Sequence, residues 1–368
     1  KNPDKKKQIN LANAITLGNN GYILSSNKLL ASLPDTDSRE YWLQRFTNYM
    51  QEELYANAAD VIKKVENTPL HNLLRNRYKA ARKGGIGTIF STTDNYKGNS
   101  VQSYSVEGDV YIGFNTYLTA SLGNYRFSNQ AQTTTVTTTT LGLKHHFELG
   151  QLYASVSNAN SGSAHTLYDL GFDYKLDDLT TVSILTGLRN IEFVQAIQNG
   201  FVTEKYYTLA LARKINNRHS LFFDYTTSSL SDTNHFFGYG ISYSYLPVKT
   251  PTKTHEFFAY YRRSGFNKQS ELYETPDKRI AYGAGWQGRW TQTNLSYWLV
   301  RTTLELGYDN LDPTDTSPNI RVQYTFPIAD KQEISVATEY GLRTNRLGNL
   351  NRFVHGYKLL ELRYNLSF

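Results

Sequence analysis

The chain has 368 residues, which is long enough for one large domain or two ordinary ones, and it contains no cysteine. The absence of cysteine excludes disulfide frameworks and thiol-ligated zinc, and no run approaches the ~18 apolar residues of a transmembrane helix. The net charge is +7, but residues 1–83 hold 14 Lys and Arg against 8 Asp and Glu, whereas the remainder holds 25 against 24. The positive charge therefore lies in the N-terminal fifth, and without a basic stripe or a known reader motif it does not indicate nucleic-acid binding.

Aromatic residues make up 14% of the chain, with 29 Tyr, 18 Phe and 4 Trp, which is more than a soluble core needs. Membrane-spanning β-strands would use these aromatic residues as girdles at the two bilayer interfaces. Such strands alternate apolar and polar side chains, so the average hydropathy of the sequence does not reveal them. The chain opens with KNPDKKK and no apolar segment follows, so no signal peptide is recognisable. A periplasmic or membrane destination then requires a processed or truncated form.

The N-terminal segment predicts helices in the ranges 6–17, 22–33, 38–52, 54–66 and 70–82. Asn19-Asn20-Gly21 predicts the first turn, Ser38 is a candidate N-cap, and Pro34 and Pro69 end two helices. The last helix leads directly into the pair Gly84-Gly85.

Two helix pairs of about 34 residues, each ending at a proline, resemble tetratricopeptide repeats. Leu11, Ala14, Gly21-Tyr22 and Pro34 lie near the places expected in that repeat, whereas the second pair lacks the usual Leu-Gly. A generic helical linker is the alternative. Two repeats are few for a stable solenoid, so we expect more of them upstream in the native protein.

Five basic residues end this segment: Arg75, Arg77, Lys79, Arg82 and Lys83. They are interpreted either as a solvated helix face or as a basic collar at the periplasmic rim of a pore, near whatever enters it.

From Gly84 onward, helical periodicity gives way to alternation with period two. Residues 168, 170, 172 and 174 are apolar or aromatic, for example, and residues 169, 171, 173 and 175 are polar or glycine. Sixteen candidate strands are centred near Thr88, Val106, Ala120, Leu141, Ala154, Leu170, Ile184, Leu209, Phe223, Ile241, Ala259, Tyr282, Leu304, Val322, Val336 and Leu362.

The final stretch, KLLELRYNLSF, alternates in the same way and ends the chain. Tyr364, Leu366 and Phe368 give the pattern aromatic-x-Leu-x-Phe, which resembles the C-terminal signal that the barrel assembly machinery recognises in bacterial outer-membrane β-barrels. The alternative is an ordinary edge strand that ends in Phe.

The connections between the candidate strands show a rhythm of long and short. Odd-numbered connections such as 94–100, 194–202 and 264–278 are longer than even-numbered ones such as 113–115 and 177–178, with 247–253 as the exception. A soluble sandwich has no reason for this rhythm, whereas an outer-membrane barrel has long extracellular loops and short periplasmic turns. The sequence predicts a transmembrane β-barrel of about 16 antiparallel strands at residues 84–368. A small α-helical arm at residues 1–83 would precede it, in the periplasm of a bacterium with its barrel in the outer membrane.

A barrel of sixteen strands leaves room for an aqueous lumen. The inferred inward positions are polar and mixed in sign: Asp169, Asp173, Lys175, Arg189, Asp224, Arg301, Glu305, Arg321, Glu339, Arg343, Glu361 and Arg363. Four consecutive strands would place Arg301, Arg321, Arg343 and Arg363 in a ladder that faces Glu305, Glu339 and Glu361. Such groups could follow a hydroxyl-rich chain, and the alternative is charge pairing that only holds the barrel open.

A repeat-like arm joined to a sixteen-strand barrel resembles the outer-membrane porins of exopolysaccharide export, the poly-N-acetylglucosamine and cellulose secretion proteins. The resemblance implies a pore that exports a polymer, with an arm that engages the polymer or periplasmic or inner-membrane synthase components. It implies outer-membrane lipids and the assembly machinery as further partners, and no cofactor. No substrate-binding residue can be carried over, and the near-neutral barrel departs from the strongly charged lumens expected for highly charged polymers.

Two other classes remain open. Translocators of surface lipoproteins also join a helical arm to a barrel, but they are expected to have fourteen strands, and the count of sixteen disfavours them. Merging the strands near Thr88 and Val106 would remove this objection. An enzyme is less favoured, because the adjacent pair His145-His146 faces opposite ways and cannot form a two-ligand site, and no phosphate-binding loop is present. We therefore expect neither catalytic residues nor a metal site.

Overall fold

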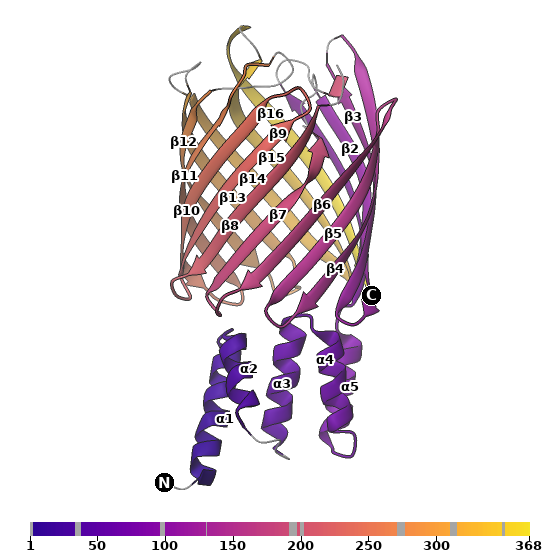
Figure 1. Cartoon of the computed structure of the whole chain (residues 1–368), viewed down its shortest axis with the longest axis vertical. Coiled ribbons are helices and arrows are strands. Elements are labelled where there is room, and N and C mark those ends of the chain that lie inside the picture. Colours follow the sequence, from indigo (N-terminus) through magenta and orange to yellow (C-terminus); the bar gives the residue numbers. More distant parts are fainter. Residues whose placement is uncertain are drawn as a thin grey trace.

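The computed structural model describes residues 3–33, 38–95, 100–129, 131–190, 197–198, 202–270, 277–309, 315–347 and 350–368. The side chains of residues 3–4, 95, 309, 315 and 342–357 lie outside this description. Figure 1 shows a barrel of tilted strands with a helical arm below one of its ends, and the C-terminus lies at that same end.

The described part of the chain forms a closed barrel of sixteen antiparallel strands, in which each strand pairs with its sequence neighbours and β1 pairs with β16. The strands are β1 (Gly84–Asn95), β2 (Ser100–Gly113), β3 (Thr116–Ser128), β4 (Thr133–Phe147), β5 (Gly150–Asn160), β6 (Ala164–Lys175), β7 (Thr180–Asn190), β8 (Thr203–Lys214), β9 (His219–Leu230), β10 (His235–Lys249), β11 (Lys253–Phe266), β12 (Arg279–Thr291), β13 (Tyr297–Asp309), β14 (Asp315–Ala329), β15 (Gln332–Leu347) and β16 (Leu350–Ser367). The predicted fold and strand number are confirmed. Thr88 and Val106 lie opposite each other on β1 and β2, so merging these two strands is wrong.

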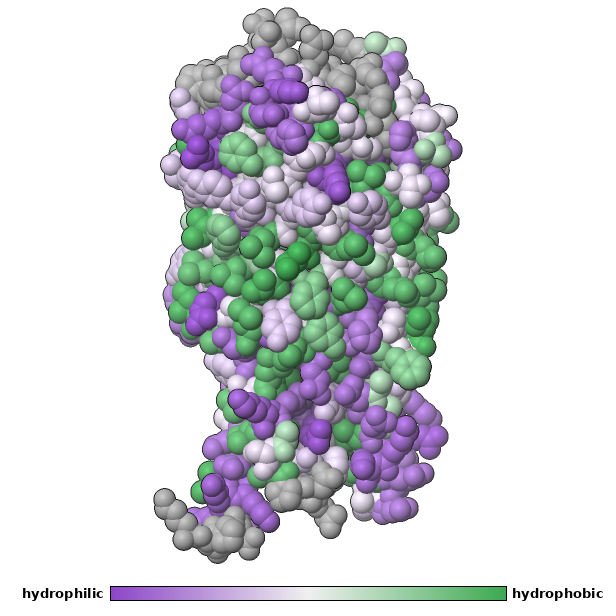
Figure 2. All heavy atoms as spheres, viewed as in Figure 1, coloured by the Kyte–Doolittle hydropathy of each residue, from purple (hydrophilic) through white to green (hydrophobic). Residues whose placement is uncertain are grey.

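Side chains alternate between the two faces of the wall. Leu170 on β6 and Ile184 on β7 point outward and are 46% and 51% exposed, whereas Asp169 and Gly187 occupy the opposite face. Figure 2 shows the result on one face of the barrel, as an apolar belt with polar regions above and below it. An exposed apolar surface of this extent fits the hydrocarbon core of a membrane better than water.

The strands are longer than predicted, and this shortens the connections. The expected exception at 247–253 is reduced to residues 250–252, which makes all the even-numbered connections short. Most of the odd-numbered connections are also short, so the predicted difference between odd and even connections is wrong except at 191–202 and 267–278. Serine, threonine and asparagine near the strand ends continue the ladder because backbone groups alone form it. Only the connections 191–202 and 267–278 span twelve residues between strands, and large parts of the predicted loops 94–100, 194–202, 264–278, 311–318 and 344–351 lie outside the described residues.

The arm contains five helices among its described residues, as predicted: α1 (Pro3–Asn19), α2 (Ile23–Ala31), α3 (Arg39–Gln51), α4 (Tyr55–Lys64) and α5 (Leu70–Ala80). None of these helices combines the length and apolarity that a membrane crossing requires. Ser38 caps α3 as predicted, since its side chain accepts a hydrogen bond from the Tyr41 amide. α3, α4 and α5 share a core around Phe46, Leu54 and Leu74, while α1 and α2 pack on Tyr41 of α3.

Two arm helices receive their N-caps from the barrel. Neither α2 nor α4 has a capping side chain at its own N-cap position. Asp178, in the turn between β6 and β7, accepts hydrogen bonds from the amides of Leu24 and Ser25 at 2.6 and 2.9 Å. Asn115, in the turn between β2 and β3, accepts one from the amide of Ala56 at 2.7 Å. Unpaired amides in the first turn of a helix attract carboxylate and amide oxygens, so each barrel turn stabilises the helix that it holds.

The link between α3 and α4 adds charged contacts to the same end of the barrel. Glu52 pairs with Lys175 of β6, and the Glu53 carboxylate lies 3.3 Å from Nε2 of His146 on β4. The ring of Tyr55 packs edge-on against Tyr111 of β2. The arm is therefore docked on the end of the barrel that carries the even-numbered turns.

Replacing Asp178 with Ala should loosen α2, because two amides lose their acceptor. We expect a cost of about 1 kcal/mol and hydrogen exchange of the Leu24 and Ser25 amides that is faster by about tenfold. Asp177→Ala is the matched control, since the partners of Asp177 are Leu179 and Thr180 of its own turn and Arg213 of β8, all of them in the barrel. Equal exchange in both variants would contradict capping by the barrel.

Candidate functional site

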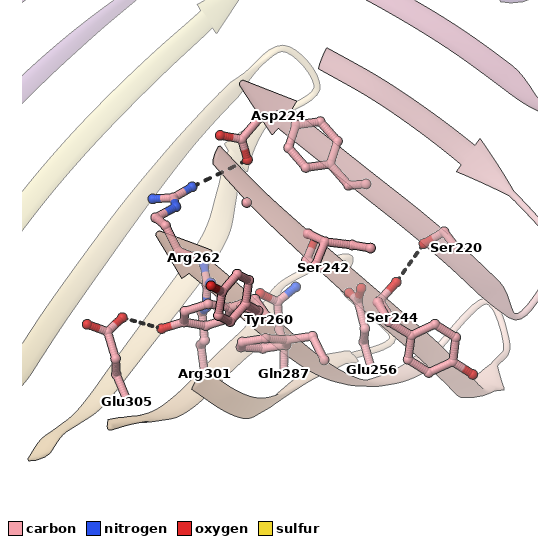
Figure 3. Close-up of a pocket in the computed structure, with 16 residues that line it drawn as sticks. Ser220, Asp224, Ser242, Ser244, Glu256, Tyr260, Arg262, Gln287, Arg301 and Glu305 are labelled. Atoms are coloured by element: carbon pink, nitrogen blue, oxygen red, sulfur yellow. Dashed lines mark hydrogen bonds and ion pairs between the residues drawn. The ribbon is translucent and has the colours of Figure 1, made fainter. Parts of the chain in front are cut away.

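The inner wall between β9 and β13 lines the cavity drawn in Figure 3, which has a volume of about 560 Å³. Asp224, Arg301 and Glu305, three of the predicted inward residues, line it together. Arg262 of β11 lies 3.6 Å from the Asp224 carboxylate, and Arg279 of β12 lies 3.3 Å from that of Glu305. These two arginines were not singled out from the sequence, although both share the period-two face of the predicted residues.

Two tyrosine side chains pass over a glycine on the neighbouring strand and bind a carboxylate on the strand beyond it. The hydroxyl of Tyr260 on β11 donates to Glu305 on β13 at 2.6 Å, and a Cβ at Gly283 of β12 would lie only 2.0 Å from the tyrosine ring. Tyr206 of β8 donates to Asp169 of β6 at 2.5 Å across Gly187 in the same manner. Side chains converge on the concave side of a barrel, so an intervening strand must offer glycine for this contact. The bridges hold two inward carboxylates in fixed positions.

A third group of charges lies on the last three strands. Arg321 of β14 binds Glu339 of β15 at 3.4 Å and Glu361 of β16 at 3.2 Å. Arg301 lies opposite Arg321 in register, but its guanidinium sits 5.0 Å from the Phe258 ring centroid. The structure thus brings together only one arginine of the predicted ladder with two of its facing carboxylates.

The rest of the predicted ladder is arranged differently. Glu305 is held by Arg279 and Tyr260, and Nε of Arg363 is buried without a hydrogen-bond partner. The side chain of Arg343 lies outside the described residues.

The remaining predicted inward residues are engaged by neighbours. Arg189 donates to Glu204 on β8 at 2.8 Å, and Asp173 accepts from Gln151 on β5 at 2.5 Å. Lys175 is bound by Glu52 of the arm, so it serves docking. Most of the predicted charges lie in ion pairs, whereas Asp169 and Asp173 are bound by neutral donors and keep their negative charge. The wall therefore carries many polar groups, most of whose charges have a partner of opposite sign.

The five basic residues at the end of the arm occupy three different places. Arg82 lines a cavity inside the barrel with Glu107 and Asp109. The Lys83 ammonium lies 3.3 Å from the centroid of the Tyr78 ring, and burial lowers its pKa. The other three, Arg75, Arg77 and Lys79, are exposed on α5. Only Arg82 lies where it can meet a molecule inside the barrel.

The two adjacent histidines face opposite ways, as expected. His145 hydrogen-bonds Thr116 at 2.9 Å on the outer side, whereas His146 meets Glu53 of the arm. Among the described residues, no group of three or more His, Asp and Glu side chains could hold a metal ion.

The predicted assembly signal lies on the strand that closes the barrel. Tyr364 and Leu366 pair with Thr88 and Ile86 of β1. The amide of the terminal Phe368 donates to the Gly84 carbonyl at 3.1 Å. The residues of the predicted assembly signal are therefore also residues that pair with β1 and close the barrel.

No family model matches the sequence, and no curated protein matches it. Among solved structures, the chain is similar to a bacterial polysaccharide outer membrane secretin with a TM-score of 0.67 at 12% identity, over 78% of this chain and 99% of that chain. CdiB from Acinetobacter baumannii gives a TM-score of 0.50 at 9% identity, over 78% of this chain and 60% of that one. At such identities the similarity establishes the fold, which is that of outer-membrane β-barrels.

Replacing Arg301 with Ala should make ion flow through the barrel more selective for cations, because it removes from the wall a positive charge that no carboxylate of the described residues pairs with. Planar-bilayer reversal potentials in a salt gradient measure this. Lys205→Ala is the matched control, since it removes the same charge from the outer face of β8, beside the exposed Tyr207. An unchanged reversal potential for Arg301→Ala would place this side chain away from the ion path.

Proposed function

We propose that this protein is an outer-membrane pore that exports a hydroxyl-rich polymer, an exopolysaccharide, from the periplasm to the cell surface. The observation that carries the proposal is the inner wall described above. It is lined by tyrosines, serines and paired charges, while the outer wall carries the apolar belt. A wide barrel with a polar interior suits passage of a hydrated molecule.

The pairing of the wall charges narrows the class of polymer. A strongly anionic or cationic chain would be expected to meet uncompensated charges of opposite sign. Here Asp224, Glu305 and Glu339 each have an arginine within 3.6 Å. Paired guanidinium and carboxylate groups still offer hydrogen bonds to hydroxyls, so the wall favours a neutral or zwitterionic glycan.

The helical arm would lie in the periplasm and meet the polymer before it enters. Its two helix pairs are consistent with tetratricopeptide-like repeats, and Arg82 faces the interior at the arm end. The similarity of the barrel to a polysaccharide secretin supports the same assignment. We propose transport without catalysis, because Asp169 and Glu305 are held by tyrosine hydroxyls, which leaves them poorly placed as a mobile acid and base.

Blocking the lumen should stop export. The chain has no cysteine, so Ser242→Cys places a single reactive thiol on the inner face of β10. Modification with a bulky maleimide should reduce secreted glycan and conductance, and glycan should accumulate within the cell.

The control is Ile241→Cys, which lies one position away on the outer face and is 49% exposed there. Its modification should leave export intact. If deletion of the gene left the secreted glycan unchanged and removed a surface protein instead, polymer export would be refuted.

A further inference from the structure

The connections at the arm end carry exposed apolar side chains. Five of the seven connections there present one, and a sixth lies at the end of β14: Phe114, Leu149, Leu176, Ile215, Leu295 and Ile328. Phe114 and Leu295 are 86% and 74% exposed. Of the described connection residues at the opposite end, none is a large apolar side chain exposed to solvent. The two ends of the barrel therefore meet different surroundings.

This apolar ring locates the membrane surface relative to the arm. Side chains as exposed as Phe114 are stable in the boundary between acyl chains and head groups. The inference rests on the membrane location proposed above. In this arrangement the hydrocarbon core of the bilayer extends to the level of the turns at the arm end. The lipid head groups then lie beside the part of the arm that is next to the barrel.

Helix α5 occupies that level. It leads into β1 after three residues and hangs below the barrel wall (Figure 1). The rise is about 1.5 Å per residue within the helix and at most about 3.3 Å per residue from Ala80 to β1, so Lys79 lies within roughly 15 Å and Arg75 within roughly 21 Å of the start of β1. The head-group layer is about 5–8 Å deep on each side of the hydrocarbon core. The surface potential of anionic lipid extends about one Debye length, roughly 8–10 Å, beyond it.

Three basic side chains of α5 are not neutralised by the protein. Arg75 and Lys79 lie on one face of the helix, and Arg77 lies about 160° around the axis from both. All three side chains are exposed, and none takes part in an ion pair recorded for the described residues. Residues 70–83 contain no Asp or Glu. The acidic residues nearest the barrel, Glu52 and Glu53, are turned to Lys175 and His146. Figure 2 shows a hydrophilic patch over α4 and α5, directly below the apolar belt.

We propose that the basic side chains of α5, Arg75, Arg77 and Lys79, bind the phosphate head groups of anionic phospholipids in the leaflet next to the arm. Lysine and arginine bind phosphate oxygens through charge-assisted hydrogen bonds, and a basic segment at a membrane surface is attracted to anionic lipid. The apolar ring anchors the barrel end in the same leaflet. Together the two contacts hold the arm at a fixed height below the mouth of the pore.

The test uses the full chain in vesicles of phosphatidylcholine with or without phosphatidylglycerol. Asn76→Cys provides the single cysteine for a nitroxide, on an exposed position between Arg75 and Arg77. Phosphatidylglycerol should slow the rotational motion of the nitroxide. It should also increase the relaxation of the nitroxide by a paramagnetic agent attached to the lipid head groups. Added salt should reverse both effects. Combining Arg75→Glu, Arg77→Glu and Lys79→Glu should lower the association constant for phosphatidylglycerol by about tenfold or more.

The matched control reverses the same number of charges in α1, through Lys5→Glu, Lys6→Glu and Lys7→Glu, and it should keep the lipid response. An equal loss in both triple variants, or no response to phosphatidylglycerol in the parent, would overturn the proposal. Circular dichroism and conductance verify that each variant is a folded, inserted barrel. Failure of glycan export with an intact lipid response would count against the proposed function alone.

Discussion

The structure depends on the need to pair every backbone hydrogen-bonding group of a sheet whose outer face is apolar. Within a bilayer an open sheet edge would leave amides and carbonyls without water, at several kcal/mol for each group. Closure of β1 on β16 removes that edge, and the bond from the Phe368 amide to the Gly84 carbonyl completes it at the arm end. An even number of antiparallel strands then returns the chain to the end at which it entered. This is why the arm and the C-terminus share one end of the barrel.

Closure also sets the chemistry of the interior. A curved wall brings side chains of alternate strands closer together on its concave side than on its convex side. Tyr260 reaches Glu305 across Gly283, and Arg321 reaches Glu361 across β15, through this convergence. The charges thereby become mutually compensated, which turns a charged sequence into a polar but nearly neutral surface. We infer that passage along such a wall depends on hydrogen bonding more than on net charge.

The arm and the barrel stabilise each other through different kinds of groups. The barrel supplies the oxygens of Asp178 and Asn115, and the arm supplies helix N-termini that lack caps of their own. The carboxylates of Glu52 and Glu53 complete the contact by pairing with His146 and Lys175 of the barrel. Docking thus determines the position of the helices below the mouth of the barrel.

The amino-acid sequence by itself determined the sixteen strands, the five helices, the cap at Ser38 and the opposite orientation of His145 and His146. These features depend on periods of 2 and 3.6 residues and on local turn chemistry, which a single chain displays directly. The tertiary structure decided the partners of Asp169, Arg321 and Lys175, the shortening of the connection at 247–253, and the separation of Arg82 from Arg75. Those features depend on strand register, on the curvature of the closed wall and on contacts between distant segments, such as Leu24 with Asp178. No local pattern encodes them, because the interacting residues lie tens to more than one hundred positions apart in the chain.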